Sequence, residues 1–129
     1  MLSGVILCID DCLQILSLRR EMLESHGYVV HTASTAYAGL KLLEELHIDL
    51  VLLEYKQEGI DAEAVALHIR QRHPRLPIVL LSAYADMPEQ ILWLVDEYVL
   101  KGAPLEELCG VIERVCNPSN YINKSHAAA

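Results

Sequence analysis

Five side chains of chemically active types each end or follow an apolar run of the sequence. They are three carboxylic acids, a hydroxyl and an amine: Asp10, Asp11, Glu54, Ser82 and Lys101. Three carboxylates brought together repel one another, and a bound cation or a proton on one of them relieves the repulsion. A site rich in oxygen ligands suits Mg²⁺, and a hydroxyl with an ammonium group can hold the outer oxygens of a phosphoryl group. If these side chains meet, they suit phosphoryl transfer to a carboxylate, or recognition there.

The elements that must position these side chains are short apolar strands that alternate with helical segments. Apolar runs rich in Val, Ile and Leu predict strands at about 5–9, 28–32, 49–54, 78–81 and 97–100. Helical periodicity and capping residues predict helices at about 13–25, after Ser34 or Thr35, at 62–72 after Asp61, and at 88–94 and 104–116. This alternation is typical of an α/β domain with a mostly parallel sheet. Because ligands of such sheets collect at the carboxyl ends of the strands, we expect the five side chains to converge there.

Length and charge limit the class of protein to which the chain can belong. The chain has 129 residues, enough for one domain with one core. We expect this domain to span 1–117 and the polar segment 118–129 to be a disordered tail or linker. The net charge of -8 disfavours direct binding of nucleic acid phosphates. No apolar run approaches the roughly 20 residues of a membrane span, and no secretory signal is evident, so we expect a cytoplasmic location without membrane contact.

The segments that end in these side chains resemble a known family. The segments VILCIDD, HGYVVHTAST, DLVLLEYKQEGIDA, RLPIVLLSA and EYVLKG resemble the successive signatures of response regulator receiver domains of two-component phosphorelay signalling. The resemblance covers about 5–116. It implies a flavodoxin-like, doubly wound sheet of five parallel strands in the order 2-1-3-4-5, with helices on both faces.

The resemblance also implies a metal site. Asp10 and Asp11 would be the metal acids, Glu54 would stand at the phosphoacceptor position beside the metal, and the backbone carbonyl of Lys56 would complete the site. The implied cofactor is Mg²⁺, which we expect this chain to bind weakly.

Three further residues match the phosphoryl-handling and switching positions of the family. Ser82 would be the hydroxyl that meets a phosphoryl oxygen, Lys101 the ion-pair partner of the acceptor, and Tyr98 the aromatic switch that moves between inward and outward rotamers. The implied partner is a sensor histidine kinase or another signalling protein, and a homodimer through the last strand and helix is a further expectation. We expect no enzymatic turnover beyond self-phosphorylation from a kinase or a small phosphodonor.

The chain departs from the family pattern at the acceptor. Glu54 stands where receivers have Asp, and its extra methylene pushes the carboxylate toward the place of the phosphoryl group. Because positioning is most of the catalysis in phosphoryl transfer, we expect ordinary phosphorylation to be absent or weak. Glu54 would then bias the conformation of a protein-interaction switch as a poor imitation of a phosphorylated acid. Other departures are Gln57 and Glu58 in the following loop, Gly102 after Lys101, and a short segment between 82 and 101.

Three alternatives stay open. Glu54 can be held by Lys101 or Lys56 in a purely structural salt bridge. The chain can instead be an Mg²⁺-dependent phosphatase or phosphotransferase with a flavodoxin-like core, although no second carboxylate follows Glu54 two residues later as an acid/base catalyst. It can also be a nucleotide-binding domain, but the first strand leads into Asp10 and Asp11 rather than a glycine-rich turn.

Overall fold

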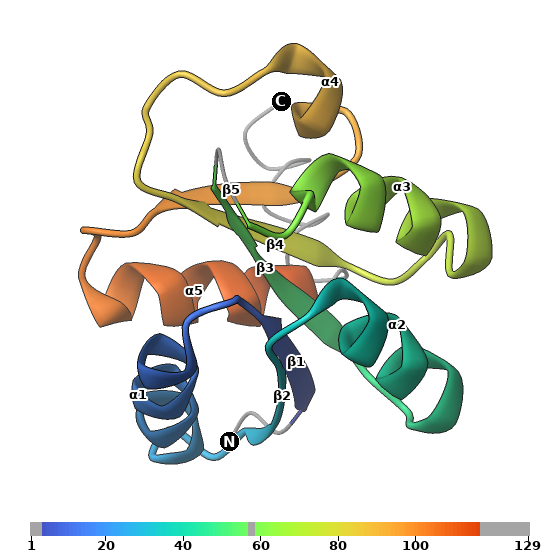
Figure 1. Cartoon of the computed structure of the whole chain (residues 1–129). Coiled ribbons are helices and arrows are strands. Elements are labelled where there is room, and N and C mark those ends of the chain that lie inside the picture. Colours follow the sequence, from blue (N-terminus) through green and yellow to red (C-terminus); the bar gives the residue numbers. More distant parts are fainter. Residues whose placement is uncertain (1–3, 57–58, 117–129) are drawn as a thin grey trace, which may run out of the picture.

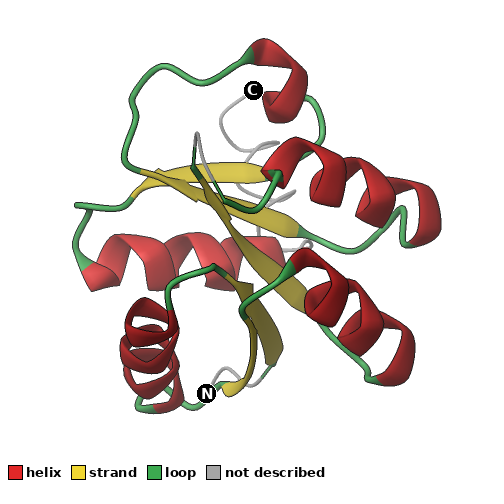
Figure 2. Cartoon of the chain, in the orientation of Figure 1, coloured by secondary structure: helices red, strands yellow, loops and turns green. Residues whose placement is uncertain are grey.

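The computed structural model describes residues 4–56 and 59–116. Five strands form one parallel sheet in the order β2-β1-β3-β4-β5, as predicted. The strands are β1 (Val5–Ile9), β2 (Val29–Ala33), β3 (Leu50–Tyr55), β4 (Ile78–Ser82) and β5 (Glu97–Leu100). The helices are α1 (Leu13–Glu24), α2 (Ala36–Glu45), α3 (Ala62–Arg72), α4 (Glu89–Leu92) and α5 (Leu105–Cys116). Figures 1 and 2 show the helices on both sides of the central sheet, which confirms the flavodoxin-like α/β class.

The two faces of the sheet are covered by different helices. Alternate residues of each central strand point to opposite faces, and both sets are apolar because helices cover both faces. Ile6 and Cys8 belong to the core cluster that contains residues of α1 and α5. Leu7 and Ile9 belong to the cluster that contains residues of α2, α3 and α4. The uninterrupted apolar run of β1 is therefore explained by burial on two sides.

Polar side chains define where several helices begin. Thr35 caps α2 by accepting a hydrogen bond from the backbone N–H of Ala38 at 3.0 Å, and Asp61 caps α3 by accepting one from Ala64 at 3.1 Å. The predicted cap at Asp61 is confirmed, and of the two candidates before α2 the cap is Thr35. None of the helices in residues 4–56 and 59–116 is long and apolar enough to cross a bilayer.

Small differences from the predicted boundaries have local causes. The second strand begins at Val29 rather than residue 28, because Gly27 turns the chain with a φ of 94° and the Tyr28 N–H still bonds to the carbonyl of Leu23 in α1. The third strand begins at Leu50 rather than residue 49, although the backbone N–H of Asp49 already bonds to the carbonyl of Val5 at 2.8 Å. The fourth helix has four residues, shorter than the predicted 88–94.

Strand register brings the predicted side chains to one edge. Ile9 is level with Leu53, so Asp10 and Glu54 come next on adjacent strands. The backbone N–H of Lys101 bonds to the carbonyl of Ser82 at 2.8 Å, which continues the pairing of β4 and β5. The carboxyl ends of β1, β3, β4 and β5 therefore meet where the family resemblance requires. The predicted tail 118–129 and the departures at Gln57 and Glu58 lie outside the described residues.

Candidate functional site

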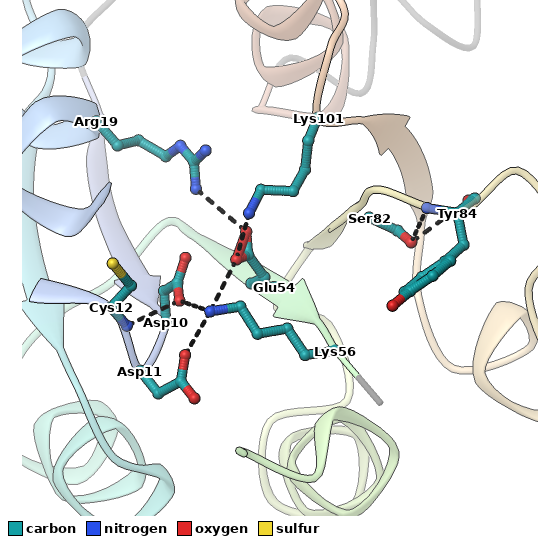
Figure 3. Close-up of polar contacts among 9 residues, drawn as sticks. All are labelled: Asp10, Asp11, Cys12, Arg19, Glu54, Lys56, Ser82, Tyr84 and Lys101. Atoms are coloured by element: carbon teal, nitrogen blue, oxygen red, sulfur yellow. Dashed lines mark hydrogen bonds and ion pairs between the residues drawn. The ribbon is translucent and has the colours of Figure 1, made fainter. Parts of the chain in front are cut away.

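Glu54 is the centre of the site. Glu54 lies near the end of β3 and is only 3% exposed. Its carboxylate nevertheless contacts three basic side chains (Figure 3). Lys101 donates a hydrogen bond to Oε2 at 2.7 Å, and the ammonium of Lys56 lies 3.5 Å from the same oxygen. The guanidinium of Arg19 approaches Oε1 at 3.8 Å. Glu54 is thus enclosed by positive charge.

Lys56 links Glu54 to the two acids that follow β1. Its Nζ donates to Oδ1 of Asp10 at 2.9 Å and to Oδ1 of Asp11 at 2.5 Å. Asp10 is buried and its Oδ1 also accepts the backbone N–H of Cys12 at 3.0 Å, whereas Asp11 is exposed. Figure 3 shows the Lys56 side chain reaching from β3 into the space between the acids. One ammonium group therefore contacts all three carboxylates.

The carboxyl groups of Asp10 and Glu54 are coupled. Burial raises the pKa of Glu54, and the neighbouring carboxyl of Asp10 adds to this increase. Lys101 acts in the opposite direction but does not cancel it. Burial also acts to raise the pKa of Asp10, but hydrogen bonds from Glu54, Lys56 and the Cys12 backbone outweigh it and lower that pKa. The two carboxyl groups therefore titrate as a pair, with the proton affinity of Glu54 raised and that of Asp10 lowered. Oδ2 of Asp10 and Oε1 of Glu54 are buried without a hydrogen-bond partner among the described residues.

Lys56 stays charged in this setting. Its hydrogen bond to Asp11, followed by that to Asp10, raises the pKa of the ammonium far above its usual range, although burial acts in the opposite direction. An ammonium surrounded by carboxylates is stabilised in its protonated form. Lys56 therefore supplies a permanent positive charge to the site.

Ser82 lies at the same edge of the sheet but is not bonded to Glu54. Glu54 is level with Leu81, whereas Ser82 is level with Tyr55. Neighbouring positions on a strand point to opposite faces, so Ser82 and Glu54 are directed apart. The Ser82 hydroxyl instead accepts the backbone N–H of Tyr84 at 2.9 Å (Figure 3).

The predicted switch residue Tyr98 is also linked to this loop. Its hydroxyl donates a hydrogen bond to the backbone carbonyl of Tyr84. The ring of Tyr84 meets that of Tyr55 edge to face, with centroids 6.2 Å apart. The segment after β4 is therefore held by Ser82 on one side and by two tyrosines on the other.

The structure brings together most of the predicted set and adds one residue. Asp10, Asp11, Glu54 and Lys101 converge, and Lys56 joins them through its side chain, while the role of its backbone carbonyl stays a prediction. Arg19 on α1 was not predicted. In the sequence it lies outside the apolar stripe of its helix, and only the placement of α1 over the edge of the sheet reveals its contact.

The acids do not form an open metal site. No group of three His, Cys, Asp or Glu side chains within 4–56 and 59–116 is arranged to hold a metal ion. The hollow between the acids, Lys56 and Ile60 leaves no room for a water-sized molecule. Because the Lys56 ammonium stands among the carboxylate oxygens, this donor set does not fit Mg²⁺ as it stands.

Comparisons with other proteins agree with the fold. The sequence model of the family described as "Response regulator receiver domain" matches residues 6–113. The transcriptional regulatory protein AfsQ1 of Streptomyces coelicolor is 37% identical over 99 residues, which are 74% of this chain and 44% of that protein. CpxR of Escherichia coli is 32% identical over 122 residues, 90% of this chain and 50% of that protein. The chain thus spans half or less of the length of these two relatives.

Solved structures show the same architecture. The response regulator TrrA of Thermotoga maritima, in complex with Mg²⁺ and BeF, superposes with a TM-score of 0.80 at 33% identity. The match covers 87% of this chain and 98% of TrrA. A receiver domain protein from Clostridium thermocellum gives a TM-score of 0.81 at 27% identity, covering 92% and 98%. By sequence model, relatives and fold together, this chain belongs to the response regulator receiver domain family.

Proposed function

We propose that this receiver domain acts mainly as a protein-interaction switch whose conformation is biased by Glu54 in place of a phosphorylatable aspartate. The observation that carries the proposal is the enclosure of the Glu54 carboxylate, which is 3% exposed and contacts Lys101, Lys56 and Arg19. A nucleophilic carboxylate needs one oxygen free and in line with the incoming phosphorus. Here Oε2 receives two ammonium groups and Oε1 faces a guanidinium, so phosphorylation is absent or weak.

The contact with Lys101 also explains how Glu54 biases the domain. Lys101 begins the segment between β5 and α5, and its 2.7 Å hydrogen bond ties that segment to β3. A phosphorylated side chain carries about -1.5 to -2 charges and three acceptor oxygens, whereas Glu54 offers at most one charge and two oxygens. Glu54 therefore holds Lys101 as a phosphoryl group would, but without the additional oxygen that would attract Ser82.

We place partner contact on the part of the surface formed by α4, β5 and α5. Apolar side chains are exposed there: Trp93 is 79% exposed, Leu100 43% and Leu92 40%. The four-residue α4 changes the shape of this face. The proposed partner is a sensor histidine kinase or another signalling protein, with a homodimer through β5 and α5 as the alternative, in the cytoplasm. Any Mg²⁺ binding at Asp10 and Asp11 is weak.

Phosphorylation by a small phosphodonor tests the proposal. The native chain, Glu54→Asp and Glu54→Gln are incubated with acetyl phosphate and Mg²⁺, and intact mass reports added phosphate. We expect none on the native chain or on Glu54→Gln, which lacks an acceptor carboxylate. We expect a gain in Glu54→Asp, because the shorter side chain withdraws its oxygens from the three basic groups. Stoichiometric, acid-stable and base-labile phosphate on Glu54 of the native chain would refute the proposal.

A further inference from the structure

We propose that the ammonium group of Lys56 is the resident cation of the acidic site, standing in the place of a divalent ion between Asp10 and Asp11. The closed form of the site would then be independent of Mg²⁺. This inference deepens the proposed function. The inference rests on the proposed function only because it assigns the metal position to Asp10 and Asp11.

The contacts of Lys56 are those expected of a central cation. Its Nζ lies 2.9 Å from Asp10, 2.5 Å from Asp11 and 3.5 Å from Glu54. These oxygens come from two different strand ends, one after β1 and one on β3. A cation shared by three carboxylates is what removes their mutual repulsion, and a tethered ammonium does so without binding from solution.

The charges of the site balance without a metal. The three carboxylates of Asp10, Asp11 and Glu54 face three basic groups, those of Arg19, Lys56 and Lys101. With all six ionised, the sum of minus three and plus three is zero. If the three acids faced only Lys101, the remaining charge would be minus two, which is the deficit that a divalent ion fills. Lys56 and Arg19 together remove that deficit.

Gly59 lies close to the same acid. Gly59 has a φ of 98°, and a Cβ atom built there would collide with Oδ2 of Asp11. Asp11 is thus contacted by Lys56 on one carboxylate oxygen and approached closely by the Gly59 backbone on the other. Mg²⁺ keeps several of its waters and dehydrates reluctantly. Because the hollow among these residues has no room for one water, the metal can enter only when the Lys56 side chain leaves.

Metal titration of matched variants tests the inference. Mg²⁺ is titrated into the native chain, Lys56→Met and the control Lys41→Met by calorimetry, and thermal unfolding is followed with and without Mg²⁺. Lys41 is exposed on α2, away from the acids. We expect Lys56→Met to bind Mg²⁺ about tenfold or more tightly than the other two chains, and only its unfolding temperature to rise with Mg²⁺. Equal affinity in the native chain and Lys56→Met would overturn the inference.

If Lys56→Met fails to fold, a measurement on the native protein tests whether the Lys56 ammonium occupies the metal position. The side-chain ¹⁵N resonance of the Lys56 ammonium is followed by NMR during addition of millimolar Mg²⁺. We expect it to keep its shift and its slow exchange with solvent, because the ammonium stays between the acids. Loss of this resonance on addition of Mg²⁺ would show that the metal displaces Lys56. Neither measurement involves phosphate on Glu54, so failure of this inference is distinguishable from failure of the proposed function.

Discussion

At the scale of single residues, the site is defined by how its charges are paired. The sequence predicted that Asp10, Asp11, Glu54 and Lys101 would converge, because their strands end at one edge of a parallel sheet. It left open whether the Lys56 side chain would enter the site, because the side chain of a residue just after a strand can point to either face of the sheet. Its ammonium contacts all three acids. The Lys56 ammonium therefore brings one positive charge to all three acids.

The raised pKa of Glu54 gives a pH dependence with a definite sign. Because burial and Asp10 place this pKa above the ordinary value of 4.5, the folded chain binds more protons than the unfolded chain from about pH 4.5 up to the folded pKa. The free energy of unfolding contributed by Glu54 therefore falls as pH rises through that window. Urea unfolding of the native chain and of Glu54→Gln should show the native advantage shrinking with rising pH, then levelling. An advantage that grows with pH would mean that the basic neighbours outweigh burial.

At the scale of elements, the strands and four of the five helices were predicted within about a residue, and the fourth helix was not. Strand limits follow from apolar runs, whereas the fourth helix was overestimated because Pro88 to Leu94 contains residues compatible with a helix, of which only Glu89–Leu92 form one. The alternation of side chains along β3 and β4 also explains why Ser82 does not face Glu54, but register between strands must be known first. Arg19 needed the placement of α1, which depends on packing.

The packing of α2 on β1 gives a prediction with a matched control. A Cβ at Gly39 would lie 2.7 Å from Cδ1 and 3.0 Å from Cγ1 of Ile9, so in Gly39→Ala either the buried Ile9 side chain or α2 must shift. We expect a loss of about 1–3 kcal/mol in the free energy of unfolding. Gly110 in α5 has open space around it, so Gly110→Ala should stabilise the chain by about 1 kcal/mol, the difference in helix propensity. Chemical unfolding of both variants checks this, and equal effects would contradict the close approach of α2.

At the scale of the whole molecule, the fold and the family were predictable and the chemical state of the site was not. Alternating apolar strands and helices predict an α/β domain with a parallel sheet, and the family resemblance implied the strand order. The state of the site depends on which of several long basic side chains reaches Glu54. Such contacts depend on side-chain rotamers and helix placement, which local sequence patterns do not encode. The result is a receiver fold in which the Glu54 carboxylate is paired with basic side chains and apolar side chains are exposed near α4 and β5.

The most direct test of this account asks whether the native domain can adopt a phosphorylated-like state. Mg²⁺ with beryllium fluoride is present in the structure of the relative TrrA, and the same reagents can be added to this chain while backbone amide shifts are recorded by NMR. We predict no saturable change at Ser82, Tyr98 or Lys101 in the native chain, and a saturable change in the double variant Glu54→Asp/Lys56→Met, which has an aspartate acceptor and no ammonium between Asp10 and Asp11. A saturable change at those three residues in the native chain would contradict the claim that Glu54 holds the domain as an interaction module.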